Sequence, residues 1–373
     1  MRPVIKNSVT TFLALISHNP FLWALVFQAL MSAFWSGTPE LTLRASAVLL
    51  GTHLFIVYLC NQYSWKELAG ILRVSNLGVA LLSLLLKPPV GEEWAGVLYS
   101  KNAFSGLMCL SAILWYLHAV YQPKGRWLSL GMTVLSFAFM KRAKSAGALV
   151  TSFILIAFSS YLRYVKRLNF QWAFTAVVLF LVISASLSIL ITDNLPLIVV
   201  DWLGKDLTFT GRTTIWAMII PLANKRPVFG YGYVGFWQPW RGFDDPAHSV
   251  ITDNEWRPPN SHNGFIEIYV QLGWIGLILF FLAFVTSLAM AVIYLIRSKK
   301  PDSVLPLILI TYMFMRNLSE SAIIDLSYTW FYYVLSTVRL SLDIAQKNFS
   351  DDRTKSQEAA SLKPTEPSNR AGP

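Results

Sequence analysis

Long apolar runs recur along most of this chain, and they constrain its fold more than any other feature. A helix needs about 20 predominantly apolar residues to cross a bilayer. Hydropathy predicts ten such spans, near residues 19–36, 41–61, 68–86, 103–121, 127–140, 146–163, 171–191, 273–296, 304–322 and 327–344. Only 14% of the residues are charged, whereas roughly 25% are charged in an ordinary soluble domain. The chain is therefore predicted to be an all-α polytopic membrane protein with about ten transmembrane helices.

One long polar segment, residues 192–261, interrupts this pattern after the seventh predicted span. The apolar stretch 262–272 follows it directly, and 262–296 is too long for one spanning helix and too short for two. We therefore expect a re-entrant segment or half-helix at 262–272, broken near Gly273. Residues 1–345 form the predicted transmembrane catalytic domain, and the polar residues 346–373 form a predicted disordered cytoplasmic tail. No cleavable signal peptide is expected, because no small-residue cleavage site follows the first span.

Lys and Arg residues in the short loops predict the orientation, because they accumulate on the cytoplasmic side. With the N-terminus inside, the inner face collects Arg2, Lys6, Lys66, Lys124, Arg126, Arg163, Lys166, Arg167, Arg297, Lys299 and Lys300. The outer face collects Lys87, Lys101, Lys141, Arg142 and Lys144. This bias predicts that both termini are cytoplasmic and that the large loop 192–261 lies outside.

Basic groups on the outer face are exceptions to that rule. They occur at Lys101-Asn102, in "KRAKS" at 141–145, and in the loop at Arg212, Lys225, Arg226, Arg241 and Arg257. A charge at membrane depth costs about 2.5–3.5 kcal/mol on insertion scales. An anion at the bilayer surface would offset this cost. Within the spans, the sequence holds few further cations, among them Arg44 and Arg73.

Arg212 lies near the predicted start of a helix. Thr210 or Thr213 could cap a helix that runs through Trp216 to Ala223. The free N–H groups of such a helix could then bind one anion together with the guanidinium. The alternative is a structural ion pair of Arg212 with Asp201 or Asp206.

His262 also stands where a helix begins, among Asn260, Ser261 and Asn263. An imidazole at the boundary between water and lipid is suited to accept a proton near neutral pH. The alternative is that His262 caps the helix. A third segment, "MRNLSES" at 315–321, spaces Arg316 and Glu320 by four residues, so a structural ion pair is the default expectation there.

Other motifs indicate no cofactor. "GYGYVG" at 230–235 matches a dinucleotide-binding pattern formally, but no strand precedes it, so a tight turn among aromatic residues is expected. The two cysteines lie within predicted spans, and no cluster of His, Cys and Asp predicts a metal site. The net charge of +11 is assigned to cytoplasmic anchoring rather than to nucleic-acid binding.

Six segments, taken in order, resemble the O-antigen ligase/polymerase superfamily, and most of all its exopolysaccharide-production polymerases. They are "NPFLWALVFQALMSAFWSGTPELTLR", "YSKNAFSG", "KRAKSAGAL", "GRTTIW…RPVFGYGYVGFW", "SHNGFIEIYVQLGWIGL" and "RNLSES". The likeness covers about residues 19–340. It implies a GT-C-like, metal-independent, lipid-linked glycosyltransferase of the bacterial inner membrane, without a cofactor and with its active site facing the periplasm. Family members often have additional N-terminal spans, so this chain is expected to begin one or more spans later than they do.

The resemblance also implies roles for individual residues. The family's extracytoplasmic histidine matches His262, and its arginines match Arg212 and Arg142 as catalytic residues. The turn around Arg142 departs from the family's S-R-S-x-T type and reads Lys-Arg-Ala-Lys-Ser. The residues expected to bind substrate are Lys101, Asn102, Arg226, Asn263 and Glu320.

The predicted function is polymerisation of lipid-linked repeat units into exopolysaccharide by inverting transfer from an undecaprenyl-diphosphate-linked glycan. The arginines would bind the diphosphate, and His262 would take the proton from the acceptor hydroxyl. One alternative is an O-antigen-type ligase that transfers the glycan to lipid A core or protein. A second is a transporter or flippase for polysaccharide or its lipid-linked precursor, and a third is a non-catalytic scaffold. The expected partners are the glycan donor and acceptor, membrane lipid, and other polysaccharide assembly and export proteins, with no nucleic acid.

Overall fold

A computed structural model describes residues 15–86, 94–98, 100–203, 210–252, 255–298 and 300–361. It describes only the backbone of residues 189–203, 210–211, 301–302 and 346–361. The described secondary structure is entirely helical. The predicted tail, 346–373, includes the end of the last helix, of which only the backbone is described. The rest of the tail, 362–373, lies outside the described residues, so the disorder of the tail stays a prediction.

The helices follow one another with short connections over most of the chain. They are α2 (Pro20–Met31), α3 (Pro39–Gln62), α4 (Trp65–Leu86), α5 (Lys101–Tyr121), α6 (Arg126–Arg142), α7 (Ala146–Val165), α8 (Phe170–Leu203), α9 (Thr210–Ala223), α10 (Gly264–Arg297), α11 (Leu305–Asn317) and α12 (Tyr328–Ser361). Short 3-10 helices are η1 (Ser32–Phe34), η2 (Gly96–Leu98), η3 (Pro239–Asp244) and η4 (Pro301–Val304). Each predicted span overlaps one of these helices, and α9 falls in the predicted large loop.

Six helices in the described part of the chain are long and apolar enough to cross a membrane. They are α3, α4, α5, α7, the Phe170–Ser188 part of α8, and α10. The other predicted spans correspond to α2, α6 and α11, which are shorter, and to α12, which is more polar. The prediction of an all-α, multi-pass membrane protein is confirmed.

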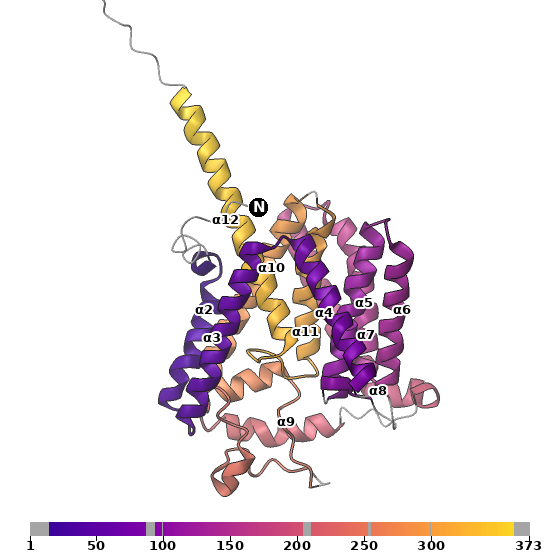
Figure 1. Ribbon diagram of the computed structural model, residues 1–373. Helices are drawn as coiled ribbons and strands as arrows, with labels where there is room; N and C mark the ends of the chain where they lie inside the picture. Colours follow the sequence, from indigo (N-terminus) through magenta and orange to yellow (C-terminus); the bar gives the residue numbers. More distant parts are fainter. Residues whose placement is uncertain are drawn as a thin grey trace, which may run out of the picture.

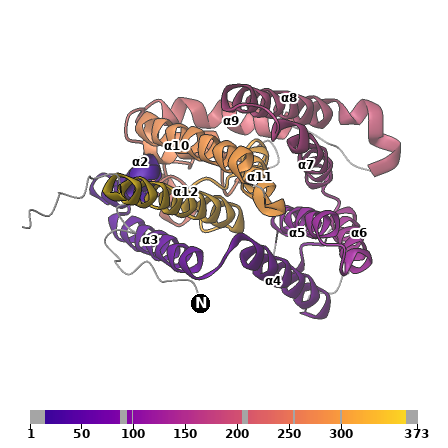
Figure 2. The same ribbon diagram turned by 90° about the horizontal axis from the view of Figure 1, so that it is seen from above.

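Helix α5 lies in the interior of the bundle, because 72% of its apolar span is buried, against 28% for α3 and α4. Apolar side chains such as Phe55, Tyr58 and Val74 on α3 and α4 are therefore exposed. A contiguous apolar surface of this kind is suited to contact with lipid. Figures 1 and 2 show α5 among its neighbours α4, α6 and α7, with α9 lying across one end of the bundle.

Consecutive helices run in alternating directions, so their connections collect at two ends (Figure 1). The start of α5, the α6–α7 turn, α9, the start of α10 and the α11–α12 connection all lie at the end labelled α9 in the figure. This alternation brings the candidate residues from five separate stretches of sequence to one end of the molecule.

Helix α10 consists of two helical segments that meet at Gly273. This residue has φ 65° and ψ −165°, a conformation that essentially only glycine adopts. The break leaves backbone groups without helical partners, and the segment 227–232 supplies them. The N–H groups of Tyr231 and Gly232 donate to the carbonyls of Val270 and Gln271, at 3.0 and 2.9 Å.

The same segment also pairs with the far side of the break. The N–H of Trp274 donates to the carbonyl of Pro227 at 2.8 Å. The "GYGYVG" turn therefore caps the half-helix 264–272. The two backbones are so close that a Cβ at Gly230 would collide with the backbone of Gln271. The sequence predicts a break at this same glycine, Gly273.

We expect the substitution Gly273→Ala to destabilise the protein by about 1–3 kcal/mol or more, because the backbone conformation is unfavourable for alanine. The added Cβ would also collide with the Val228 carbonyl. The thermal unfolding midpoint of the purified protein in detergent should fall by several degrees.

The matched control is Gly147→Ala, within α7, where an added Cβ has nothing within 4 Å. This control should leave the midpoint unchanged or raise it slightly, because alanine is the better helix former. Equal midpoints for the two variants would show that the break at Gly273 does not require glycine.

Candidate functional site

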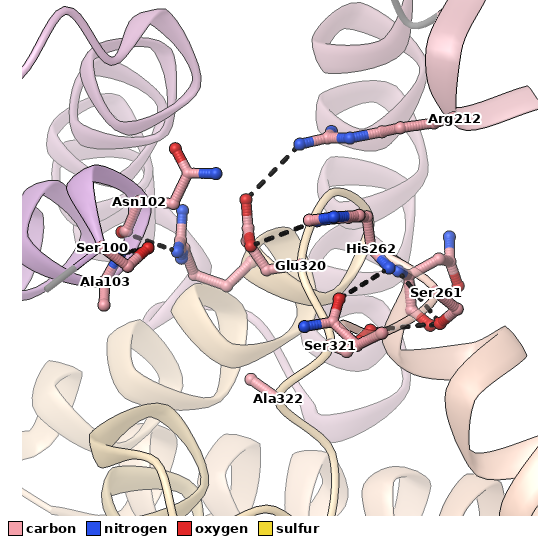
Figure 3. A network of polar contacts seen from close by, with 12 residues as sticks. Ser100, Asn102, Ala103, Arg212, Ser261, His262, Glu320, Ser321 and Ala322 are labelled. Carbon is pink, nitrogen blue, oxygen red and sulfur yellow. Dashed lines mark hydrogen bonds and ion pairs between the residues drawn. The ribbon is translucent and has the colours of Figure 1, made fainter. Parts of the chain in front are cut away.

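Three segments that are far apart in the sequence meet beside the carboxylate of Glu320 (Figure 3). Arg212 Nη2, from α9, lies 3.4 Å from Glu320 Oε1. His262 Nδ1, two residues before α10, lies 3.9 Å from Glu320 Oε2. All three side chains are largely buried, with exposed fractions of 22%, 18% and 17% for Arg212, His262 and Glu320. The structure thus brings together two predicted catalytic residues and one predicted substrate-binding residue.

The expected ion pair between Arg316 and Glu320 is wrong for the described structure. Helix α11 ends at Asn317, and although the Glu320 N–H still donates to the Arg316 carbonyl at 2.9 Å, the Glu320 carboxylate contacts Arg212 and His262. Arg316 Nη2 instead donates to the Asn102 carbonyl at 3.0 Å. Arg212 contacts Glu320, and its alternative pairing with Asp201 or Asp206 stays a prediction, because those side chains lie outside the described ones.

The groups around Glu320 keep it ionised. Burial alone would raise the pKa of this carboxyl, but His262, Arg316 and Arg212 outweigh burial and hold the pKa below its usual value. A carboxylate that stays negative can orient an imidazole and stabilise its protonated form, as in hydrolases with a Ser-His-Asp triad. Nδ1 of His262 is buried, and it forms no hydrogen bond with any of the described residues.

His262 is held by its backbone and by one aromatic ring. Its φ of 51° is uncommon for a residue other than glycine, and its N–H donates to Asn260 Oδ1 at 2.9 Å. The imidazole stacks on Trp256 with ring centroids 6.0 Å apart. These contacts place the ring at the N-terminus of the half-helix, where the helix dipole is positive.

The helix cap itself is Asn263, so the cap role considered for His262 is wrong. Asn263 Oδ1 accepts from the N–H groups of Phe265 and Ile266, at 3.0 and 3.1 Å. Asn263 Nδ2 donates to the Leu318 carbonyl at 3.4 Å. With both ends of its amide engaged, Asn263 positions His262, and its predicted contact with substrate stays a prediction.

A second carboxylate, Glu267, fixes the segment that carries His262. Its Oε2 accepts from the Ser261 N–H at 2.8 Å, and its Oε1 accepts from Trp237 Nε1 and Gln271 Nε2 at 2.8 and 2.7 Å. Ser261 Oγ in turn lies 3.1 Å from Ser321 Oγ. Sequence reasoning missed Glu267, although an acidic residue within an apolar half-helix was a visible signal for a buried polar role.

Helix α9 forms over the range that the sequence predicts and is attached to the His262 segment. Trp216, one turn after Arg212, donates its Nε1–H to the Ser261 carbonyl at 2.8 Å. At the other end of α9, the Tyr231 hydroxyl donates to the Leu222 carbonyl at 2.9 Å. Helix α9, which carries Arg212, is therefore joined directly to the segment that carries His262.

The remaining predicted basic residues approach Glu320 less closely. Lys101 begins α5 and lies within electrostatic range of both Glu320 and Lys144. Lys144 occupies the α6–α7 turn with φ 52°, two residues after Arg142, the last residue of α6. Asn102 contributes its backbone carbonyl to Arg316. The turn that carries Arg142 thus lies on the same side of the site as Lys101.

Arg226 lies elsewhere among the described residues. Its Nη1 donates to the Trp35 carbonyl at 3.3 Å, and its guanidinium lies 5.0 Å from the centre of the Tyr231 ring. Together with Phe229 it lines an open apolar hollow of about 360 Å³. The contacts of Arg226 therefore do not join it to Glu320, and its role in binding the same substrate stays a prediction.

A pocket of about 260 Å³ adjoins the His262 segment. It is lined by Tyr233, Val234, Trp237, Pro259, Asn260, Glu267, Gln271, Ser321, Ile323, Ile324 and Asp325. Burial raises the pKa of Asp325, and the nearby charge of Glu267 also raises it. The hydrogen bond from the Leu326 N–H lowers this pKa, but it does not outweigh burial. This pocket is acidic and aromatic, and its lining includes none of the basic residues near Glu320, such as Arg212 and Lys101.

Two β-branched residues in this lining have positive φ angles, Val234 at 51° and Ile324 at 52°. Such conformations are costly and cluster at functional sites. As for metal binding, no group of three or more His, Cys, Asp or Glu residues in the described part is placed to hold an ion. Metal independence stays a prediction.

Residues 131–281 match the family described as O-antigen ligase. The chain is also 27% identical over 290 residues to "Exopolysaccharide production protein ExoQ" of Rhizobium meliloti (strain 1021). That alignment spans 73% of this chain and 65% of the relative, so the chain covers less than two thirds of the relative's length. The family match contains Arg142, Arg212 and His262, whereas Lys101 and Glu320 lie outside it. These matches confirm the predicted resemblance of the chain to the O-antigen ligase/polymerase superfamily, including an exopolysaccharide production protein.

Proposed function

We propose that this protein is a membrane glycosyltransferase that polymerises lipid-linked repeat units into exopolysaccharide. It would act on the periplasmic face of the bacterial inner membrane, where an undecaprenyl-diphosphate-linked glycan is the donor. The observation that carries this proposal is the meeting of Arg212 and His262 at Glu320, at one end of the bundle. This arrangement provides an anion-binding group and a proton acceptor in one place.

Arg212, Lys101 and the turn that carries Arg142 form the donor side. A guanidinium can bind two phosphate oxygens at once, and it stabilises the charge that develops as the glycosidic bond breaks. Because Arg212 already contacts Glu320, the diphosphate would replace that carboxylate as the partner of Arg212. Glu320 would then be left to pair with His262.

His262 forms the catalytic base. With Nδ1 directed to Glu320, Nε2 is the nitrogen that takes the proton from the acceptor hydroxyl. The hydroxyl oxygen attacks the anomeric carbon of the donor, and the bond to the diphosphate oxygen breaks with its electron pair. Direct displacement inverts the anomeric centre. The 3.9 Å separation exceeds a hydrogen bond, and such contacts often tighten only when substrate binds.

The acidic pocket beside His262 forms the acceptor side. Carboxylate and amide groups such as those of Asp325 and Asn260 hydrogen-bond to sugar hydroxyls, and the ring of Trp237 offers an apolar face. The two carboxylates in the lining, Glu267 and Asp325, would disfavour a diphosphate there. The charges on the two sides of His262 would therefore direct donor and acceptor to different places.

The family match favours one second candidate, because that family is described as O-antigen ligase. A ligase would use the same donor side and the same base. It would differ in the acceptor, which would be lipid A core or protein in place of a second lipid-linked repeat unit.

The test of the proposed function uses purified protein in liposomes with a lipid-linked repeat unit and no nucleotide sugar. The glycan should lengthen with release of undecaprenyl diphosphate, as measured by mass spectrometry. The variant His262→Ala should lower the rate by about 10²–10⁴-fold, because general-base help is lost.

The matched control is His248→Ala, since His248 lies in the same large loop but packs on Phe243. This control should retain the full rate. No lengthening by the unmodified protein would exclude the polymerase, and transfer to lipid A core alone would identify a ligase. Full activity of His262→Ala would remove the base assignment.

Replacing Arg212 with Lys keeps the charge but removes the two-pronged guanidinium. We expect the KM for the lipid-linked donor to rise by about tenfold or more, as for the loss of one charge-assisted hydrogen bond. Arg241→Lys is the control, because Arg241 bonds to Gln238 away from Glu320. Unchanged kinetics for both variants would show that only the positive charge at position 212 matters.

The variant Asp325→Asn tests the acceptor side separately. We expect the KM for the acceptor to rise by about tenfold, as for the loss of a hydrogen bond to a charged group. The KM for the donor should not change, which distinguishes this result from a general loss of structure. Initial rates measured while donor and acceptor concentrations are varied in turn would give both constants, and equal rises in both would contradict the assignment.

A further inference from the structure

A second group of basic side chains lies at the end of the bundle opposite Glu320. Lys66, Arg73, His118 and Lys300 line one pocket of about 440 Å³. Helix α5 begins with Lys101 near Glu320 and carries His118 near its other end. A rise of 1.5 Å per residue separates these two positions by about 25 Å. The two sites therefore lie at opposite ends of the bundle, and this one plays no part in the proposed chemistry.

Arg73 is the unusual member of this group. It lies eight residues after the start of α4, about 12 Å along the helix, and its side chain is partly buried. Its guanidinium lies 5.4 Å from the centre of the Trp115 ring, a favourable cation–π distance. An arginine within a spanning helix is rare, and it commonly marks a functional contact.

The carboxylates described near this pocket are engaged with other groups. Glu67 accepts from the N–H and hydroxyl of Ser64, at 2.7 and 2.6 Å. Asp343 pairs with Arg339 and accepts from Trp65 Nε1. Among the side chains that the structure describes, Lys66, Arg73 and Lys300 form no ion pair. The pocket therefore carries an excess of positive charge.

The rest of the lining determines what kind of anion fits. Leu114, Leu117, Val304 and Leu305 form apolar walls beside the cations. A small free anion would contact only the basic groups and leave the apolar side of the pocket unfilled. An amphiphile would pack its chain against the apolar side while its head group meets the basic groups. The lining thus matches a molecule with an anionic phosphate at one end and hydrocarbon at the other.

We propose that this pocket binds an anionic phospholipid from the adjacent membrane leaflet, with the phosphate between Arg73 and Lys300. The leaflet is the cytoplasmic one in the orientation that the sequence predicts. Basic pockets between transmembrane helices are known to hold anionic head groups. The bound lipid would join α4, α5 and the start of α11, which are the elements that supply the pocket's lining.

The test measures lipid binding to the full-length protein in detergent by native mass spectrometry. Phosphatidylglycerol should bind in preference to phosphatidylcholine with the same acyl chains. The variants Arg73→Gln and Lys300→Gln should each weaken phosphatidylglycerol binding by about fivefold, the effect expected for one basic residue. Binding of phosphatidylcholine should not change.

The matched control is Arg167→Gln, which removes the same charge from an exposed position that does not line the pocket. An equal loss in this variant, or equal binding of the two lipids to the unmodified protein, would overturn the proposal. Inorganic phosphate forms a further arm, and its displacement of phosphatidylglycerol at millimolar concentration would identify a phosphate site instead. Because Lys300 is exposed, Lys300→Gln remains informative if Arg73→Gln does not fold.

Discussion

Backbone hydrogen bonding at the break in α10 determines how the α9 end of this protein is built. Backbone groups within a membrane protein must find partners inside the protein, because lipid offers none. Segment 227–232 supplies these partners on both sides of Gly273, so the loop and the half-helix form one unit. The half-helix in turn begins directly after His262, and α9 is tied to the same segment through Trp216. A local need for hydrogen bonds thereby positions a base and an arginine from separate parts of the chain.

Two carboxylates at this end have different physical roles. Glu267 accepts three hydrogen bonds of 2.7–2.8 Å from side chains and backbone, so moving it would leave buried donors unpaired. Glu320 has longer contacts of 3.4 and 3.9 Å with Arg212 and His262, and these contacts can be exchanged at lower cost. Glu267 is suited to hold the site in shape, and Glu320 is suited to change partners when an anion reaches Arg212.

The sequence predicts the helices and the break well, because apolar period and glycine conformation are local properties. It also indicates Arg212 and His262, though partly through resemblance to a family. It does not predict that His262 meets Glu320, since 58 residues separate them and the contact depends on where α11 ends. The sequence left the N-cap of α10 uncertain by one residue: His262 was considered, and Asn263 occupies the position. Arg226 has the right charge and lies in the right loop, but the backbone of 227–232 pairs with α10 and Arg226 turns toward Trp35.

The separation of charge around His262 bears on how a polymerase could keep its two substrates apart. In the proposed reaction both donor and acceptor carry a lipid diphosphate, so either could occupy the basic groups at Arg212 and Lys101. A sugar of the acceptor that reaches the pocket of Glu267 and Asp325 brings its hydroxyl to His262, while the carboxylates repel the acceptor's own diphosphate. Only the donor would then place its diphosphate at Arg212, next to the base. The direction of transfer would follow from this electrostatic difference, without any need for the two sugars to differ.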